Sequence, residues 1–240
     1  MSTKEIQEVA RPGGDALGDR MKVYEMAEAG RRATPLLPLL ARLDGRCFST
    51  FTRGLRRPYD ERLSRCMRNL TSKLVEETSA CCGYTQSDEI TLAWYTTNLK
   101  TELFFGGRYQ KMTSVLAGMA SLEFEAQLRA ELPEKAGRGA VFDCRAWTVP
   151  TTEEAANAFL WREQDAVKNS ISSAAQSVFS HKQLFGKHTG EMQEMLFQKG
   201  INWNDYPAFF KRGTYLQRKS VSRPFTVEEL AELPPLHNAR

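Results

Sequence analysis

Two aspartates in the first half of the chain are the residues whose setting best suits catalysis. Asp44 ends an apolar run and is followed by Gly45, and Asp88 lies in the short polar segment Gln86–Glu89. Mg²⁺ prefers oxygen ligands and is usually held by one or two carboxylates completed by substrate phosphates and water. Two such ions about 3.5–4 Å apart can stabilise both oxygens of a phosphoryl displacement. Asp44, Asp88 and the Gly45 carbonyl are therefore a candidate metal site, although aspartates at strand ends are often only solvated turn residues.

The segments around these aspartates are expected to be strands. Cys81–Thr85 and Ile90–Tyr95 are rich in β-branched, aromatic and sulfur residues, and they flank an acidic turn, so they predict a hairpin. The apolar run that follows Pro35 and Pro38 predicts a strand ending at Asp44, where Gly45 lets the chain turn closely. A last strand is expected over Ala140–Val149.

Two long helices are expected between these strands. The first begins with Pro58 and acidic residues, as a helix N-terminus prefers, and the second covers Gln110–Leu132. Their buried faces follow intervals of three and four residues. The residues expected inside are Leu63, Cys66, Met67, Leu70, Leu74 and Val75 in the first helix, and Met112, Val115, Leu116, Met119, Leu122 and Phe124 in the second.

The order strand, helix, strand, strand, helix, strand predicts an α+β fold of the ferredoxin-like βαββαβ type, with helices on one face of an antiparallel sheet. The first and third strands then lie side by side, which brings Asp44 close to Asp88. We expect four parts: a flexible lead over 1–18, a palm-like core over 19–150, a helical and loop extension over 151–217, and a tail over 218–240. Asp19 is expected to cap a helix in the core, and Thr151 one that carries Ala155, Phe159 and Trp161 inward.

Composition favours a globular protein with one substantial core, since 41% of the 240 residues are hydrophobic and 26% are charged. The net charge of +4 is modest, so nucleic-acid binding would depend on basic clusters such as those in 53–68 and 211–223, which could equally be solvated faces. No apolar run suits a membrane span or signal core, so a cytoplasmic protein without membrane contact is expected. The five cysteines lack C-x-x-C spacing and are expected to be reduced core residues.

Several motifs together resemble the tRNA(His) guanylyltransferase family, whose members add nucleotides in the 3′-to-5′ direction. The two aspartates lie in segments similar to the metal motifs of that family, Arg42-Leu43-Asp44-Gly45-Arg46 and Gln86-Ser87-Asp88-Glu89. The resemblance continues through residues 20–25, 142–145, 161–165, 168–170, 195–197, 200–205 and 211–214. It therefore covers most of the chain.

The resemblance implies a role for each matching residue. Asp44, Asp88 and Glu89 would be the catalytic residues. Asp44 and Asp88 would ligate two Mg²⁺ ions together with the Gly45 carbonyl, and Glu89 would support this acidic cluster. The residues implied to bind the nucleotide are Asp44, Gly45, Arg46, Cys47, Phe48, Ser49, Arg57, Ser87 and Asp88, with Arg57 on a triphosphate. The residues assigned to RNA are Arg145, Lys168, Asn169, His181, Lys182, Lys187, Lys211 and Arg212. The segment Ser180–His188 is basic and aromatic, which suits RNA backbone contacts but also a solvated loop.

Two departures from the family pattern narrow the expected activity. Ser49 stands where many relatives have His, and Val167-Lys168-Asn169-Ser170 stands where the eukaryotic enzymes carry His-Ile-Asn-Asn. The second departure favours the bacterial and archaeal-type branch, which resembles enzymes that restore missing nucleotides at the 5′ end of truncated tRNA, templated by the opposite strand of the acceptor stem. The resemblance then implies activation of the 5′ phosphate with ATP or GTP, attack by the 3′-hydroxyl of an incoming nucleoside triphosphate, and a homotetramer.

Three alternatives remain open from the sequence. A tRNA(His) guanylyltransferase would add a single 5′ guanosine. A nucleotidyl cyclase-like palm shares the predicted layout, but the segment Gly83–Glu89 departs from its Gly-Gly-(Asp/Glu)-Glu-Phe motif. A non-catalytic RNA-binding protein would keep its function after Asp44→Ala or Asp88→Ala, and would lose affinity when arginines are changed.

Overall fold

The computed structural model describes residues 16–219, 224 and 226 of the chain. Its strands are β1 (Leu39–Gly45), β2 (Cys82–Gln86), β3 (Glu89–Trp94), β4 (Phe142–Thr148) and β5 (Thr214–Gln217). Its α-helices are α2 (Ala16–Ala29), α3 (Phe48–Phe51), α4 (Glu61–Glu77), α5 (Tyr109–Glu131), α6 (Thr152–Gln176), α7 (His181–Leu184), α8 (Thr189–Gln198) and α9 (Ala208–Arg212). Three short 3₁₀ turns are η1 (Phe104–Gly107), η2 (Pro133–Lys135) and η3 (Trp203–Asp205).

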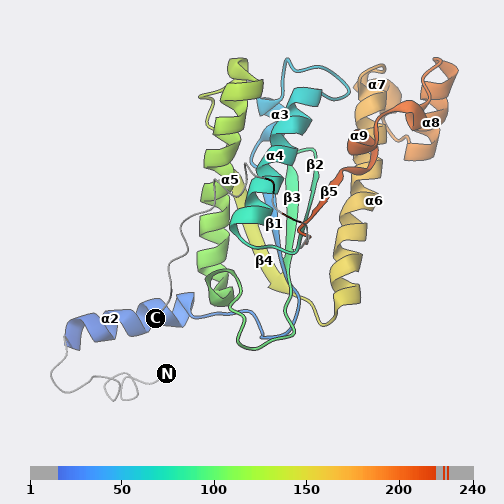
Figure 1. The fold of residues 1–240 in the computed structure, drawn as a ribbon. Coiled ribbons are helices and arrows are strands. Elements are labelled where there is room, and N and C mark those ends of the chain that lie inside the picture. The colour runs from blue at the N-terminus through green and yellow to red at the C-terminus, as the bar shows by residue number, and fades with distance from the viewer. Residues whose placement is uncertain (1–15, 220–223, 225, 227–240) are drawn as a thin grey trace.

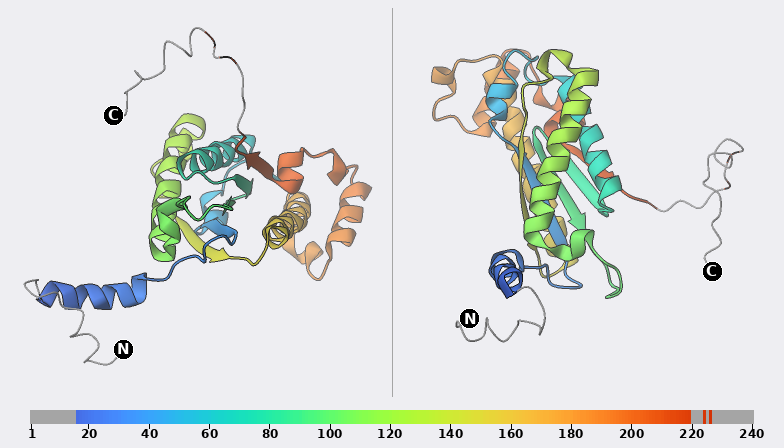
Figure 2. Two further views of the ribbon diagram at one scale, coloured as in Figure 1. Left: turned by 60° about the horizontal axis from the view of Figure 1, so that its bottom comes forward. Right: turned by 90° about the vertical axis from the view of Figure 1, so that its left-hand side faces the viewer.

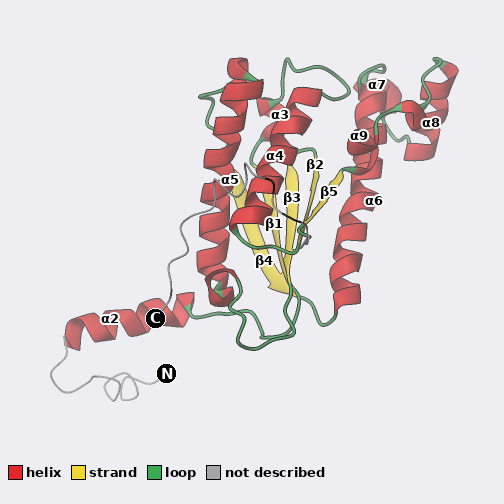
Figure 3. Ribbon diagram, viewed as in Figure 1, coloured by secondary structure: helices red, strands yellow, loops and turns green. Residues whose placement is uncertain are grey.

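The five strands form one antiparallel sheet in the order β4-β1-β3-β2-β5 (Figures 1 and 3). The predicted α+β class and the βαββαβ order are confirmed, and β1 lies beside β3 as expected. The edge strand β5 was not predicted. Its four residues pair with β2, so the C-terminal extension completes the sheet of the core as well as packing on it.

One face of the sheet is covered by α4 and α5 (Figure 2). Alternate residues of a strand point to the same face, and on β1 the residues that point to this side are Leu39, Ala41 and Leu43, all fully buried. They pack with apolar residues of both helices, including Leu70 and Phe124, in the main core of the protein. The periodicity of both helices is confirmed at most positions, because Cys66, Met67, Leu70, Leu74, Val75, Met112, Leu116 and Phe124 are buried.

The other face of the sheet lies against α6 (Figure 2). Its buried apolar cluster is small and consists of Leu40, Tyr84, Ala93 and Phe159. Tyr84 donates a hydrogen bond from its hydroxyl to the Arg212 carbonyl at 2.8 Å, which ties the sheet to α9. Beyond this cluster, the same face carries the charged residues Asp44, Glu89 and Asp143, so it is the side on which polar chemistry can take place.

The helices after α6 form a small C-terminal unit around the end of that helix. Ala174 and Ala175 of α6 pack with Leu184 and Leu196 in a third apolar cluster. At the other end of the chain, α2 projects from the body of the protein (Figure 1). No helix of the described segments is long and apolar enough to span a membrane.

Two apolar residues expected in the core are exposed. Leu122 of α5 is 77% exposed and Trp161 of α6 is 53% exposed. Each lies two residues from a buried phenylalanine of its own helix, Phe124 or Phe159, which is about 200° around the helix axis at 3.6 residues per turn. Trp161 instead contacts arginine side chains, and one of them, Arg162, has its guanidinium carbon 4.4 Å from the centre of the Trp161 ring.

Two expected helix starts and the placement of the cysteines are also corrected. Pro58 precedes α4 without being part of it, and Asp60 is the N-cap, accepting from the Arg62 backbone N–H at 3.1 Å. Asp19 lies in the first turn of α2, which begins three residues earlier, and is therefore not its cap. Of the five free cysteines, Cys66 is buried, and Cys144 and Cys82 are partly buried against the apolar clusters. Cys47 and Cys81 are exposed, so the expected core placement is wrong for these two.

Candidate active site at the ends of β1 and β3

The end of β1 and the β2–β3 turn meet as the strand order predicted. Asp44 pairs across the sheet with Glu89, the first residue of β3. The Gly45 backbone N–H donates to the Asp88 carbonyl oxygen at 3.1 Å, so the two segments that carry the aspartates are held directly together. Gly45 is needed for this arrangement, because a Cβ atom there would lie 2.2 Å from the Phe48 ring.

Three carboxylates form a row across the strands on the α6 side of the sheet. Asp44 of β1 lies directly between Glu89 of β3 and Asp143 of β4 in the strand register. We refer to Glu89, Asp44 and Asp143 as the acidic row. Both outer members bind arginines: Glu89 pairs with Arg162 at 2.6 Å and Asp143 pairs with Arg145 at 3.3 Å. The two arginines leave the central carboxylate for another partner.

Asp88 is the fourth carboxylate at this place, and its environment disfavours a lone negative charge. Burial raises the pKa of Asp88 to about 6, and the neighbouring charge of Asp44 acts in the same direction, against a hydrogen bond from Ser87. Burial also raises the pKa of Glu89, opposed by its bonds to Arg162. Within the described residues, Asp44 and Asp88 form no ion pair with a basic side chain. A bound cation would therefore stabilise the charged form of this pair.

Backbone conformation near the aspartates is unusual at two residues. Ser87, immediately before Asp88, has a φ of 50°, and Cys47, three residues after Asp44, has a φ of 56°. Residues other than glycine adopt this left-handed region at some cost in energy, and such positions concentrate at functional sites. Both residues are exposed and lie where the chain reverses direction, so the strain is confined to the two turns that present the aspartates.

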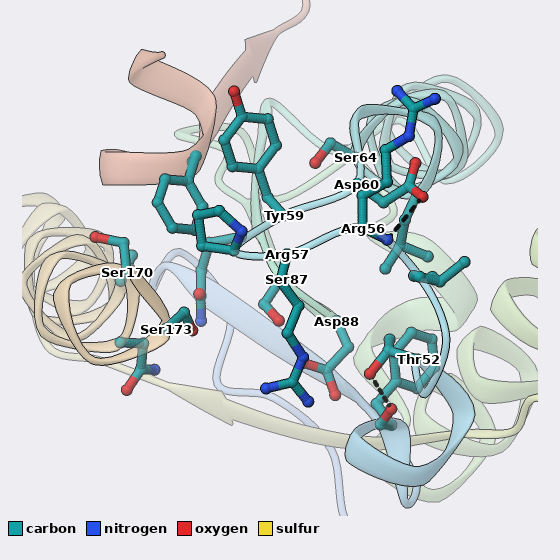
Figure 4. Close-up of a pocket in the computed structure, with 18 of the residues that line it drawn as sticks. Thr52, Arg56, Arg57, Tyr59, Asp60, Ser64, Ser87, Asp88, Ser170 and Ser173 are labelled. Atoms are coloured by element: carbon teal, nitrogen blue, oxygen red, sulfur yellow. Dashed lines mark hydrogen bonds between the residues drawn. The ribbon is translucent and has the colours of Figure 1, made fainter. Parts of the chain in front are cut away.

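A pocket of about 460 Å³ opens beside Asp88. The loop before α4 forms one side of it with Arg56 and Arg57, and the Ser87–Asp88 turn forms another (Figure 4). Figure 4 shows Arg57 and Asp88 extending toward the same end of the pocket. Cationic and anionic groups at one end suit a metal-bound polyphosphate, because guanidinium groups bind phosphate oxygens directly and carboxylates bind them through a metal ion.

Another side of the pocket is a neutral, polar face of α6, and Phe209 and Phe210 of α9 also line the pocket. Asn169, Ser173 and Gln176 line it at intervals of four and three residues, together with Ser170 (Figure 4). Amide and hydroxyl groups can each donate and accept hydrogen bonds. The pocket therefore combines a charged end with a wall suited to the uncharged parts of a ligand.

Comparison with known proteins agrees with this geometry. A family model described as tRNA(His) guanylyltransferase matches residues 18–150, which is more than half of the chain. The chain belongs to the tRNA(His) guanylyltransferase family. Members of this family are nucleotidyltransferases, so the predicted enzyme class is confirmed. The described cavity and both aspartates accordingly lie in a member of a nucleotidyltransferase family.

Two solved structures are especially similar to this chain. A bacterial tRNA(His) guanylyltransferase-like protein in complex with ATP matches with a TM-score of 0.79 and 39% identity, covering 85% of this chain and 87% of that one. A bacterial protein of the same description in complex with GTP matches with a TM-score of 0.74 and 35% identity, covering 87% of each chain. Among other relatives, the tRNA(His) guanylyltransferase of Debaryomyces hansenii is 28% identical over 82% of this chain and 80% of its own length.

The nucleotide-binding residues expected from the family resemblance fall into two groups in the structure. Phe48, Ser49, Arg57, Ser87 and Asp88 line the pocket. Phe48 also packs in the main core, where its ring lies 5.5 Å from that of Phe124. The residues that lie close to the pocket without lining it are Asp44, Gly45, Arg46 and Cys47.

The donor set of this family member fits Mg²⁺. Asp44 and Asp88 offer carboxylate oxygens and Gly45 offers its carbonyl, which is the incomplete shell that Mg²⁺ typically completes with substrate phosphates and water. In the described part of the chain, no group of three or more His, Cys, Asp or Glu residues could hold a metal by itself.

The residues expected to bind RNA are dispersed around this site. Asn169 lines the pocket, and Lys168 is exposed beside it on α6. Arg145 is exposed on the acidic-row face, whereas His181 and Lys182 are exposed on α7. The other three residues expected to bind RNA already have partners within the chain. Lys187 pairs with Glu191, Lys211 donates to the Asn204 carbonyl and Arg212 pairs with Glu163.

Several pocket residues were not singled out from the sequence. Arg56, Tyr59 and Asp60 come from the loop before α4, and Ser173 and Gln176 come from α6. The helical residues had a detectable signal, since small polar residues recur there at helical spacing. The loop residues had none, because their approach to α6 depends on packing between Tyr59 and Phe210, whose ring centres lie 4.8 Å apart.

Proposed function

We propose that this protein is a templated 3′-to-5′ nucleotidyltransferase that restores missing nucleotides at the 5′ end of truncated tRNA. The observation that carries the proposal is the arrangement of Asp44 and Asp88 next to a nucleotide-sized pocket, with Arg57 extending toward the same end of the pocket as Asp88 (Figure 4). Its partners are nucleoside triphosphates and tRNA with a 5′ monophosphate.

The pocket supports a nucleoside triphosphate as the ligand. Arg57 is placed to bind phosphate oxygens, and Asn169, Ser173 and Gln176 offer hydrogen bonds to the sugar or base. The structural relatives in complex with ATP and with GTP support activation of the RNA 5′ phosphate by either nucleotide. A wall of amide and hydroxyl groups suits this tolerance, because such groups can pair with donors or acceptors on the base.

The α6 sequence supports repair over single-guanosine addition. The segment Val167–Ser170, which differs from the eukaryotic His-Ile-Asn-Asn, contributes Asn169 and Ser170 to the pocket lining. The difference therefore lies at the site itself. The bacterial guanylyltransferase-like protein in complex with ATP is also more similar in sequence, at 39% identity, than the Saccharomyces cerevisiae enzyme at 23%.

The residues around the pocket perform mainly binding and orientation. Asp44, Asp88 and the Gly45 carbonyl would hold Mg²⁺, which would supply charge neutralisation at the transferring phosphate. Arg57 orients the triphosphate, and Ser49 and Ser87 line the same pocket. His181 and His188 lie outside the pocket lining, so no histidine of the described segments is placed as a general base. The chemistry is therefore phosphoryl transfer by positioning and electrostatics.

The quaternary structure and cellular location belong to the same proposal. The family resemblance supports a homotetramer that binds tRNA across subunits in the cytoplasm. Light scattering of the purified full chain, alone and with tRNA, measures the mass directly. A monomeric mass under both conditions would contradict the tetramer.

The decisive experiment uses labelled tRNA that lacks its first 5′ nucleotide. With Mg²⁺ and all four nucleoside triphosphates, the wild-type protein is expected to extend this RNA until the acceptor stem is fully paired, and Asp88→Ala is expected to leave it unchanged. Changing the template base opposite the gap should change the nucleotide that is added.

Other results would replace the proposal. Addition of one guanosine to full-length histidine tRNA, with no repair of the truncated RNA, would identify a tRNA(His) guanylyltransferase. Binding of both RNAs without addition to either would indicate a non-catalytic RNA-binding protein.

A further inference from the structure

Arg162 makes the most buried ion pair near the acidic row. Its Nε and one terminal nitrogen donate to the two carboxylate oxygens of Glu89 at 2.6 and 2.7 Å. The side chains of Arg162 and Glu89 are only 10% and 8% exposed. This geometry uses both oxygens of Glu89, since a bidentate guanidinium pair occupies a carboxylate edge completely.

Glu89 would otherwise be well placed to bind a metal ion. It follows Asp88 in the chain and pairs with Asp44 across the strands. Glutamate with free oxygens at that position would add a third negative ligand to the proposed Mg²⁺ site. The charge and number of carboxylates tune both affinity and ion selectivity.

We propose that Arg162 is a positioning residue of the metal site, holding Glu89 as an ion-paired carboxylate that does not ligate the metal. The side-chain ligands are then limited to Asp44 and Asp88, which leaves coordination positions for substrate phosphates. This inference rests on the proposed metal-dependent nucleotidyl transfer and adds to it the reason why Glu89, next to Asp88 in the chain, is not a third ligand.

The same ion pair also connects the metal site to the nucleotide pocket. Arg162 lies on α6 two turns before Asn169, and it makes a second ion pair with Asp165 at 3.0 Å on the same helix. Glu89 begins the strand that follows the Ser87–Asp88 turn. The pair therefore fixes the neutral wall of the pocket relative to the turn that carries Asp88.

The opposite end of the acidic row has a weaker version of this arrangement. Asp143 and Arg145 are both 55% exposed and are joined by one contact of 3.3 Å. Exposed pairs of this kind are screened by water and salt. Arg145 is therefore free to exchange Asp143 for an RNA phosphate, whereas Arg162 is committed to Glu89.

Direct measurement of metal binding tests the proposal without requiring turnover. Mn²⁺ binding to the full-length protein would be measured by electron paramagnetic resonance for the wild type, Asp88→Asn, Glu89→Gln, Arg162→Gln and the Glu89→Gln/Arg162→Gln double variant. Glu163→Gln is the matched control, because Glu163 is the next residue on α6 and pairs with Arg212 away from the acidic row.

Loss of a ligand should differ clearly from loss of a positioning residue. We expect Asp88→Asn to weaken Mn²⁺ binding by at least about tenfold. Glu89→Gln should weaken Mn²⁺ binding by less than Asp88→Asn does, about threefold, because it removes a neighbouring charge but no ligand. Arg162→Gln releases Glu89 as a new ligand and should bind Mn²⁺ roughly tenfold more tightly. That gain should vanish in the double variant, and Glu163→Gln should resemble wild type.

Two results would overturn the proposal. One is a loss of Mn²⁺ binding in Glu89→Gln comparable to that in Asp88→Asn, which would make Glu89 a ligand. The other is an equal gain from Arg162→Gln in the presence and absence of the Glu89 carboxylate, which would reduce Arg162 to a distant positive charge. If Arg162→Gln does not fold, the comparison of Glu89→Gln with Asp88→Asn still decides whether Glu89 is a ligand. Arg162→Lys then replaces Arg162→Gln and is expected to retain Mn²⁺ binding near the wild-type value.

Failure of this inference is distinguishable from failure of the proposed function. A wild-type protein that binds Mn²⁺ but adds no nucleotide to truncated tRNA would contradict tRNA repair and leave the metal-binding comparison valid. A protein that repairs tRNA while Glu89→Gln loses Mn²⁺ binding would contradict only the role given to Arg162.

Discussion

The two faces of the sheet have different roles in this protein: one packs the main apolar core and the other carries the charged residues of the site. On the α4/α5 face, β1 contributes Leu39, Ala41 and Leu43 to a large apolar core. On the α6 face, the intervening residues of the same strand are Leu40, Arg42 and Asp44, of which only the first is part of an apolar cluster. One seven-residue strand therefore supplies both stability and charge, because alternate side chains point to opposite faces.

The comparison of the two faces shows that most charged residues of the site lie outside the apolar core that supports it. Changes on the two faces should have separable effects: those on the α4/α5 face should reduce stability, and those at the acidic row should reduce activity. The following changes examine that separation, in order of decreasing expected effect.

The largest effect is expected for Asp88→Asn. The substitution keeps the shape of the turn but removes a charge that supports phosphoryl transfer, so nucleotide addition should fall on the order of 10³-fold, about 4 kcal/mol at 1.36 kcal/mol per decade. Rates per folded molecule and thermal melting would be measured together. A melting temperature below that of the wild type would contradict the separation of stability from activity. A melting temperature equal to or above that of the wild type would support the separation, since burial disfavours the charge of Asp88.

Phe124→Ala should have the second largest effect, with the opposite pattern. Phe124 is fully buried on the α4/α5 face, and its removal should lower the free energy of unfolding by about 3–5 kcal/mol. Leu122→Ala on the same helix is the matched control, because the Leu122 side chain is exposed and should change stability by less than about 0.5 kcal/mol. Urea unfolding measures both, and equal losses would show that the described packing of α5 is wrong.

Asp60→Ala should have an intermediate effect that depends on pH. The Arg62 guanidinium, with the backbone N–H groups of Arg56 and Arg62, holds the pKa of Asp60 below its usual value. A lowered pKa stabilises the folded state above the unfolded pKa, and this contribution is lost as pH falls through the folded pKa. Removing the N-cap together with its bonds to the Arg62 guanidinium should cost about 2 kcal/mol at pH 7 and less near pH 3.

Unfolding measured at both pH values tests the Asp60 prediction. A cost that is constant, or that grows on acidification, would contradict the proposed charge of Asp60. Because Asp60 also lines the pocket, a separate change in the KM for nucleotide would show how far the two faces communicate through the loop before α4.

The smallest effect is expected for Tyr84→Phe. This change removes only the hydroxyl that donates to the Arg212 carbonyl, so the free energy of unfolding should fall by about 1 kcal/mol. Local loosening of α9 should be visible as faster hydrogen exchange there, with the α4/α5 face unchanged. Equal acceleration on both faces would mean that the α6 side is not an independent unit.

The sequence was sufficient for the order of elements around the aspartates. Strong periodicity in α4 and α5 and the polar turn before Glu89 made the βαββαβ pattern detectable, and the strand order then placed Asp44 beside Asp88. The strand β5 escaped prediction because four residues carry too little pattern to be distinguished from a loop. Leu122 was misplaced because hydrophobicity alone does not define which side of a long helix is buried.

The partners of the charged residues could not be predicted in the same way. Glu89 and Arg162 are 73 positions apart, and their pairing depends on where α6 crosses the sheet. The pocket wall formed by Asn169 and Ser173 depends on that same crossing. The type of chemistry was therefore visible in short motifs, whereas the selection of ligands among neighbouring carboxylates required the tertiary structure.

The pairing of β5 with β2 has a consequence for the protein during its synthesis. All other strands are complete once Thr148 has been made, but β2 keeps an open edge until Thr214–Gln217 appears roughly 65 residues later. At about 5–20 residues per second, this interval lasts roughly 3–13 s. An unpaired edge can join a strand from another chain. Nascent chains that stall within α6 or α8 should therefore be the form of this protein most prone to aggregate on the ribosome.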